Sequence, residues 1–112
     1  MQGFLECFIT GLISHLILPT LLSWLTEARF SAGLSAALPP SVAIAEKFGE
    51  NVVPEEGDSY NELHDCGIIY YPEHPYLLCV MTKSTESFET LSSLIQHISE
   101  FMYQKMDEEY GG

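Results

Sequence analysis

The chain has 112 residues, 46% of them hydrophobic, which is enough to form the core of one small domain. It carries 16 acidic residues against 4 basic ones, which gives a formal charge of −12 at pH 7. Phosphate backbones and anionic lipid would repel such a chain, so this composition argues against nucleic-acid binding.

An uncharged segment occupies residues 7–26, a length that could span a bilayer as a helix. His15 and Pro19 interrupt it, however, and no positively charged region precedes it as in a clear signal peptide. We therefore favour helices over residues 4–30 that pack only partly on the rest of the chain, with a membrane anchor through residues 7–26 as the alternative. An exposed apolar surface that favours self-association is expected from Leu16, Ile17, Leu21, Leu22 and Trp24.

A strand is predicted over residues 42–49, because apolar residues alternate there after two prolines. The alternation places Lys47 on the face opposite Ile44 and Glu46. A lysine beside Gly49 near a strand end is able to bind a ligand carboxylate, although a surface lysine beside a turn glycine is the commoner explanation.

The acidic, turn-rich residues 50–65 indicate an exposed connection, and a hairpin with strands over 66–71 and 76–82 is predicted to follow. Cys66 and Cys79 fall on its two strands. We expect them to be buried free thiols rather than a disulfide, because the chain has an odd number of cysteines and neighbouring strands often give unsuitable geometry.

A long amphipathic helix is predicted over residues 86–107, capped by Ser84 or Thr85. Steps of three and four residues define an apolar stripe that should lie across the sheet, and Leu94 and Phe101 widen it. The stripe consists of Leu91, Ile95, Ile98 and Met102. The expected fold is therefore α+β: a three-stranded antiparallel sheet with a long C-terminal helix and N-terminal helices.

Catalytic motifs are missing from the 112 residues. The positions three residues before the lysines hold Ile44, Val80 and Met102, so no Ser-x-x-Lys pair is present. The histidines lack metal-ligand spacing, and no glycine-rich phosphate loop occurs, so we expect neither a metal nor a cofactor. His64 is interpreted as exposed, and Asp65 as making a local hydrogen bond in a turn.

Three stretches together resemble the carboxy-terminal part of class A β-lactamase-like serine hydrolases, the penicillin-recognising family. They are "LTEARFSAGLSAALPPSVAIAEKFGE", "LHDCGIIYYPEHPYLLCVMTKS" and "LSSLIQHISEFMYQKM". In that family a Lys-Thr-Gly or Lys-Ser-Gly strand is followed by Asn-Asp or His-Asp, a hairpin and a final helix. Residues 27–112 show this order, whereas residues 1–26 match the family poorly.

The resemblance implies that Lys47 helps to hold a substrate carboxylate and tunes the proton network around the nucleophile, and that the backbone N–H of Glu50 supplies half of an oxyanion hole. Gly49 lets the backbone approach the substrate closely. Phe48 departs from the pattern, because the family usually places a hydroxyl at that position. The Ser-Asp-Asn loop is absent as well as Ser-x-x-Lys, so the chain resembles a truncated hydrolase. We expect it to be inactive alone and to meet a β-lactam or peptidoglycan-like substrate only within a complete parent protein, of a family that is usually exported.

The alternative is a small acidic protein that is anchored in a membrane or that binds a partner. In a further variant, the exposed face of the sheet receives a missing half from another chain.

Overall fold

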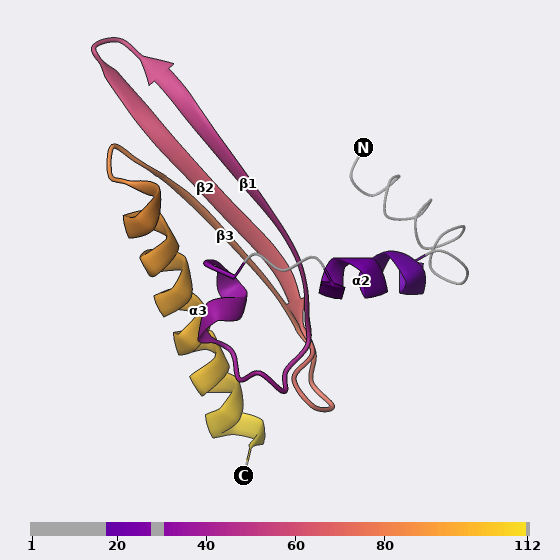
Figure 1. The fold of residues 1–112 in the computed structure, drawn as a ribbon. Helices are drawn as coiled ribbons and strands as arrows, with labels where there is room; N and C mark the ends of the chain where they lie inside the picture. Colours follow the sequence, from indigo (N-terminus) through magenta and orange to yellow (C-terminus); the bar gives the residue numbers. More distant parts are fainter. Residues whose placement is uncertain (1–17, 28–30, 112) are drawn as a thin grey trace, which may run out of the picture.

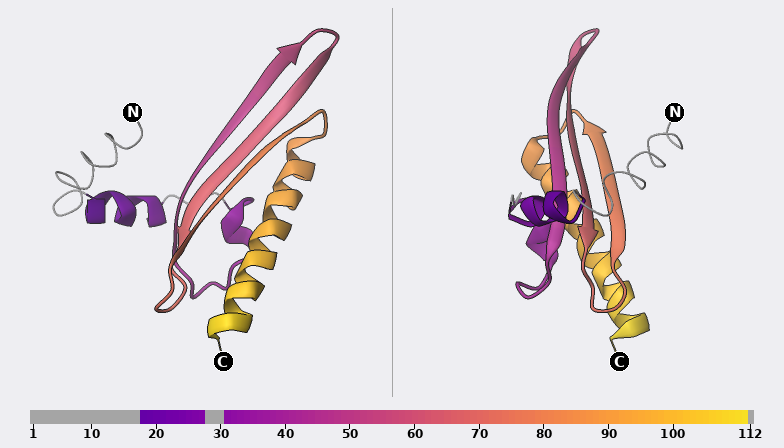
Figure 2. Two further views of the ribbon diagram at one scale, coloured as in Figure 1. Left: turned by 180° about the vertical axis from the view of Figure 1, so that it is seen from behind. Right: turned by 90° about the vertical axis from the view of Figure 1, so that its right-hand side faces the viewer.

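The computed structural model describes residues 18–27 and 31–111. The elements, in order, are α2 (Leu18–Glu27), the 3-10 helix η2 (Leu34–Ala37), β1 (Ile44–Glu55), β2 (Asp58–Ile69), β3 (Tyr76–Ser84) and α3 (Phe88–Tyr110). The strands form an antiparallel sheet in the order β1-β2-β3. Helix α3 runs along one face of it, and α2 lies on the other side (Figures 1 and 2). The predicted α+β fold is confirmed.

The exposed connection predicted over residues 50–65 is wrong, because this stretch forms the distal part of a β1–β2 hairpin. The hairpin turns at Gly57, whose φ of 82° lies in the left-handed region that glycine adopts without strain. Acidic side chains are compatible with these strands because the residues around the turn are exposed to solvent. In Figure 1 the tip of the hairpin extends beyond β3, whose pairing with β2 ends at Asn61 and Ser84.

We call the side of the sheet that faces α3 the core face and the opposite side the outer face. The core face contacts η2 and α3 around a buried apolar cluster. The cluster consists of Leu34, Val42, Ile44, Leu63, Ile69, Val80, Leu91 and Ile95. Gly67 lies at its centre, where a Cβ atom would be 2.9 Å from Cδ1 of Ile44, so only glycine fits without a shift.

Helix α3 buries one stripe, as its spacing predicts: Leu91 and Ile95 are buried, and Ile98 packs against the cluster. The expected widening of the stripe is wrong, because Leu94 and Phe101 are 47% and 56% exposed. Ser99 is buried instead, and its hydroxyl donates to the Leu34 carbonyl over 2.8 Å. A serine can occupy a core position when its hydroxyl is satisfied in this way.

The N-cap of α3 is Ser87, whose hydroxyl accepts a hydrogen bond from the Thr90 N–H. The predicted caps Ser84 and Thr85 are therefore wrong. The hydroxyl of Ser84 accepts from the Glu86 N–H over 3.1 Å, so it stabilises the turn that precedes the helix.

Helix α2 contacts β1 and keeps part of its apolar surface in solvent. Trp24 is 60% and Leu21 37% exposed, whereas Leu22 is half-buried. Leu16 and Ile17, expected to join this surface, lie outside the described residues. Across residues 18–27 and 31–111, no helix combines the length and the apolar character that crossing a membrane requires.

Candidate functional site

Lys47, Gly49 and Glu50 lie together on β1, which is an outer strand of the described sheet. All three residues are exposed. Lys47 and Gly49 share the outer face because they pair with Cys66 and His64 of β2, while buried Glu46 and Asp65 occupy the core face. The strand begins at Ile44 rather than at residue 42, and from Ile44 to Gly49 the expected alternation is present.

The main-chain groups of Glu50 point away from the sheet. The Tyr70 N–H donates to the Ala43 carbonyl over 3.0 Å, which marks residue 43 as a hydrogen-bonded pair with β2. Because hydrogen bonding alternates along an antiparallel strand, odd-numbered residues of β1 bond to β2, and even-numbered ones face the open edge, with which no strand of the described residues pairs. Pro54, which has no N–H to lose, occupies one of these edge-facing positions.

Lys47 is electrostatically distinct from the other two lysines of the described residues. Lys83 pairs with Glu55 at 2.6 Å and Lys105 pairs with Glu108 at 3.0 Å. Lys47 makes no such pair within residues 18–27 and 31–111. Its ammonium is thus an unneutralised positive charge on a chain of formal charge −12, available to an anion from solution.

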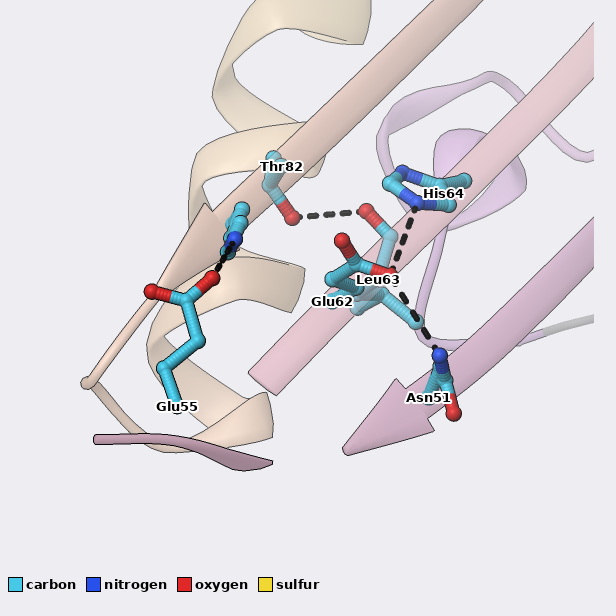
Figure 3. Close-up of polar contacts among 7 residues, drawn as sticks. Asn51, Glu55, Glu62, Leu63, His64 and Thr82 are labelled. Carbon is cyan, nitrogen blue, oxygen red and sulfur yellow. Dashed lines mark hydrogen bonds and ion pairs between the residues drawn. The ribbon is translucent and has the colours of Figure 1, made fainter. Parts of the chain in front are cut away.

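His64 lies on the outer face opposite Gly49 and is partly exposed, with 38% of its side chain accessible. Its Nε2 is 3.9 Å from Oε2 of Glu62, and Nδ2 of Asn51 donates to the same oxygen over 3.5 Å. Figure 3 shows Glu62 between these two side chains. Nδ1 of His64 is buried without a hydrogen-bond partner in the described part of the chain. The polar side chains of His64, Glu62 and Asn51 therefore begin two residue pairs beyond Lys47 along the strand.

The local turn hydrogen bond predicted for Asp65 is wrong. Asp65 is fully buried in the middle of β2, and its Oδ2 accepts a hydrogen bond from the Leu34 N–H over 2.9 Å. Desolvation is the main cause that raises the pKa of Asp65 from 3.8 to about 7. The hydrogen bond from Leu34 lowers this pKa, whereas a hydrogen bond to Glu46 and the negative charge of Glu46 raise it further. Asp65 therefore connects η2 to β1 directly beneath the Lys47 segment.

Sequence reasoning did not find the Glu46–Asp65 pair as a unit. The available signal was the position of Glu46 on the apolar face of the predicted strand, where a carboxylate requires a polar partner.

The free thiols expected for Cys66 and Cys79 are also wrong, because the two residues form a disulfide. They are direct partners in the β2–β3 register, and Lys47 pairs with Cys66 on the other side. Lys47, Cys66 and Cys79 thus form one row across the outer face. The described residues contain no group of three acidic, histidine or cysteine side chains that could hold a metal ion.

A family model described as "Beta-lactamase enzyme family" matches residues 17–106 of the chain. The chain belongs to the β-lactamase enzyme family. The match includes Lys47, Gly49, Glu50, His64 and Asp65.

A solved structure titled "Structure of PBP-A" has the same fold, with a TM-score of 0.60 at 22% sequence identity. The likeness covers 80% of this chain but only 31% of that one, so the β-lactamase-family chain described here spans less than a third of its structural relative. A search among curated proteins returned no match.

Proposed function

We propose that this chain supplies the carboxylate-binding strand of a class A β-lactamase-like acyl-transfer site. The observation that carries the proposal is the arrangement on β1, where the unpaired Lys47 ammonium lies on the outer face and the Glu50 N–H is directed to the open edge. The Cα atoms of Lys47 and Glu50 are three residues apart on one strand, roughly 10 Å, and the flexible lysine side chain can bring its ammonium closer to the Glu50 N–H. The ammonium and the N–H would thus hold two separated anionic groups of one substrate.

Each residue has a distinct part in this proposal. The Lys47 ammonium attracts the substrate carboxylate, and the Glu50 N–H donates to the oxyanion that forms as the acyl carbonyl is attacked. Gly49 leaves the space between them open, since a Cβ atom there would meet nothing within 4 Å. Phe48 has no hydroxyl that could bind the carboxylate, and it faces the core side in register with Asp65.

The nucleophile must come from a region outside these 112 residues, because no serine here precedes a lysine by three positions. We infer that such a region, in a longer protein or in a separate chain, docks beside β1 and completes the site. The substrate class is a β-lactam or a related peptide that bears a carboxylate.

The proposal is tested by turnover and binding measured separately. The chain alone should hydrolyse a chromogenic β-lactam no faster than buffer does. In an NMR titration with an intact carboxylate-bearing β-lactam, the amide of Glu50 should shift, and Lys47→Ala should remove the shift.

Lys83→Ala is the matched control, because Lys83 is an exposed lysine of the same sheet that already pairs with Glu55. It should leave the Glu50 shift unchanged. Equal shifts in the wild type and Lys47→Ala would refute the assignment of Lys47. Turnover that is abolished by replacing a serine of this chain would refute the inference that the nucleophile lies outside these 112 residues.

A second candidate function is partner binding by the acidic sheet, which the apolar surface of β3 favours. Leu77 and Met81 lie on the outer face and are 70% and 75% exposed. Such exposure on an outer strand is typical of a surface that another protein covers.

A further inference from the structure

We propose that the Cys66–Cys79 disulfide is a redox-modification site of the folded protein, reduced by low-molecular-weight thiols with assistance from Lys47. The proposal is independent of the acyl-transfer function, because it concerns thiol reactivity in the chain itself. It rests on the position of the disulfide relative to solvent, to Lys47 and to the hydrophobic core.

Solvent access is the first observation. Cys79 is exposed and Cys66 is half-buried, and both lie on the outer face, away from α3. Exchange requires a thiolate to reach one sulfur of the disulfide. The sulfur of Cys79 is therefore the site of attack, and Cys66 is the leaving group.

Lys47 is the second observation. It is the direct partner of Cys66 in the β1–β2 register, so the two Cβ atoms are roughly 5 Å apart. Its ammonium makes no ion pair in the described part of the chain, and its side chain projects from the same face of the sheet as Cys66, on which negative charge develops. A nearby positive charge stabilises a departing thiolate and attracts an anionic attacking thiolate.

The third observation is that the core does not depend on the disulfide. The buried cluster lies on the core face, and β2 and β3 remain paired from Asn61–Ser84 to Ile69–Tyr76. In addition, the Thr82 hydroxyl donates to the Leu63 carbonyl over 2.6 Å (Figure 3). Reduction should therefore leave the sheet folded.

The reaction with a dithiol balances in two steps. One thiolate of the reductant forms a bond to Sγ of Cys79, and the S–S electron pair leaves with Cys66, which then takes up a proton. The second thiol of the reductant displaces Cys79 and closes the reductant into a cyclic disulfide. Two electrons and two protons pass to the protein, and the product carries two thiols beside Lys47.

The test uses the full chain with Cys7→Ser, so that only Cys66 and Cys79 remain. Dithiothreitol is added at increasing concentrations without denaturant, and thiols are trapped with iodoacetamide and counted by mass spectrometry. The rate should rise in proportion to reductant while the far-UV circular dichroism stays native. A rate that reaches a plateau at the unfolding rate would overturn the proposal, as would two free thiols before any reductant is added.

Variants separate the role of Lys47 from general effects of charge. Lys47→Gln should slow reduction about three- to fivefold, and Lys47→Arg should restore most of the rate. Lys83 lies on the same face as Cys79 but four residues further along β3. The disulfide of Lys83→Gln should therefore be reduced at the wild-type rate. Identical rates for Lys47→Gln and the wild type would overturn the assistance by Lys47. With glutathione, the mixed disulfide should form on Cys79, and an adduct mainly on Cys66 would contradict the assigned direction of attack.

Discussion

Asp65 is a single residue that joins three parts of the fold. It belongs to β2, accepts a hydrogen bond from Leu34 of η2 and shares another with Glu46 of β1. Two carboxyl groups in one buried site cannot both ionise at low cost, which is why desolvation and Glu46 together raise the pKa of Asp65 to about 7. The protonation of Asp65 therefore affects how firmly the Lys47 segment is held.

Asp65→Asn should reduce the dependence of stability on pH. With a native pKa raised from 3.8 to about 7, the folded state retains a proton that the unfolded chain has released in this interval. Stabilisation by this group is fully present below pH 3.8 and is lost as pH rises through about 7. Asparagine keeps an acceptor for Leu34 and a donor for Glu46 but does not titrate. Between about pH 5 and about pH 8, the free energy of unfolding should fall for both proteins. The fall should be smaller for Asp65→Asn than for the wild type, and the difference should be on the order of 2 kcal/mol.

Urea denaturation at the two pH values measures this difference. Glu100→Gln removes one exposed carboxylate from α3 and controls for the change in net charge. Its pH dependence should follow the wild type. If Asp65→Asn followed the wild type as well, Asp65 would not be the group that titrates.

At the scale of the elements, α3 stabilises the sheet through a narrow stripe rather than a broad one. Ile95 is fully buried against the core cluster, whereas the adjacent Leu94 is 47% exposed. Two neighbouring aliphatic residues therefore contribute very differently to the free energy of unfolding.

Ile95→Ala should destabilise the protein by about 2–5 kcal/mol, because it removes buried methyl groups and leaves a cavity. Leu94→Ala should cost less than about 1 kcal/mol, since much of the Leu94 side chain is already in water. Urea denaturation followed by circular dichroism at 222 nm compares the two. Equal losses would mean that Leu94 is covered in solution, for example by a second molecule.

Periodicity predicted the first half of β1 and the long helix α3. Alternation located the β1 segment with Lys47 on its outer face, and spacing of three and four residues located α3 to within three residues at its C-terminal end. The distal hairpin was missed because its acidic and turn-forming residues obscure a strand pattern that pairing with a neighbour stabilises.

Contacts between distant residues were not predictable from local patterns. Asp65 and Leu34 are 31 residues apart, so nothing near Asp65 in the sequence indicates its partner. The disulfide required the β2–β3 register, which places Cys66 directly opposite Cys79. The candidate carboxylate-binding residues were adjacent in sequence, so a resemblance could locate them, and their role stays a prediction.

At the scale of the whole molecule, the sheet is covered unevenly. The core face carries η2 and α3, whereas on the outer face Leu77 and Met81 of β3 remain exposed. Exposed apolar side chains on an outer strand favour association. The formal charge of −12 opposes it, because like-charged molecules repel until salt screens them.

The purified chain should therefore self-associate more at high salt, as measured by sedimentation velocity. Leu77→Lys together with Met81→Lys should keep it monomeric across the same salt range. Leu94→Lys, which alters an exposed leucine on α3 on the other side of the sheet, should leave association unchanged. A wild-type chain that is monomeric at all salt concentrations would show that this surface does not bind a second copy.

The alternating hydrogen bonds of β1 should also produce alternating rates of amide hydrogen exchange. Amide protons of Lys47 and Gly49 are held by β2 and should exchange with deuterium slowly, whereas those of Phe48 and Glu50 face the open edge and should exchange within seconds. Slow and fast amides would then alternate residue by residue along a single strand. Any protein region or ligand that pairs with this edge would remove the alternation, so the exchange rate of the Glu50 amide reports directly whether the edge is occupied.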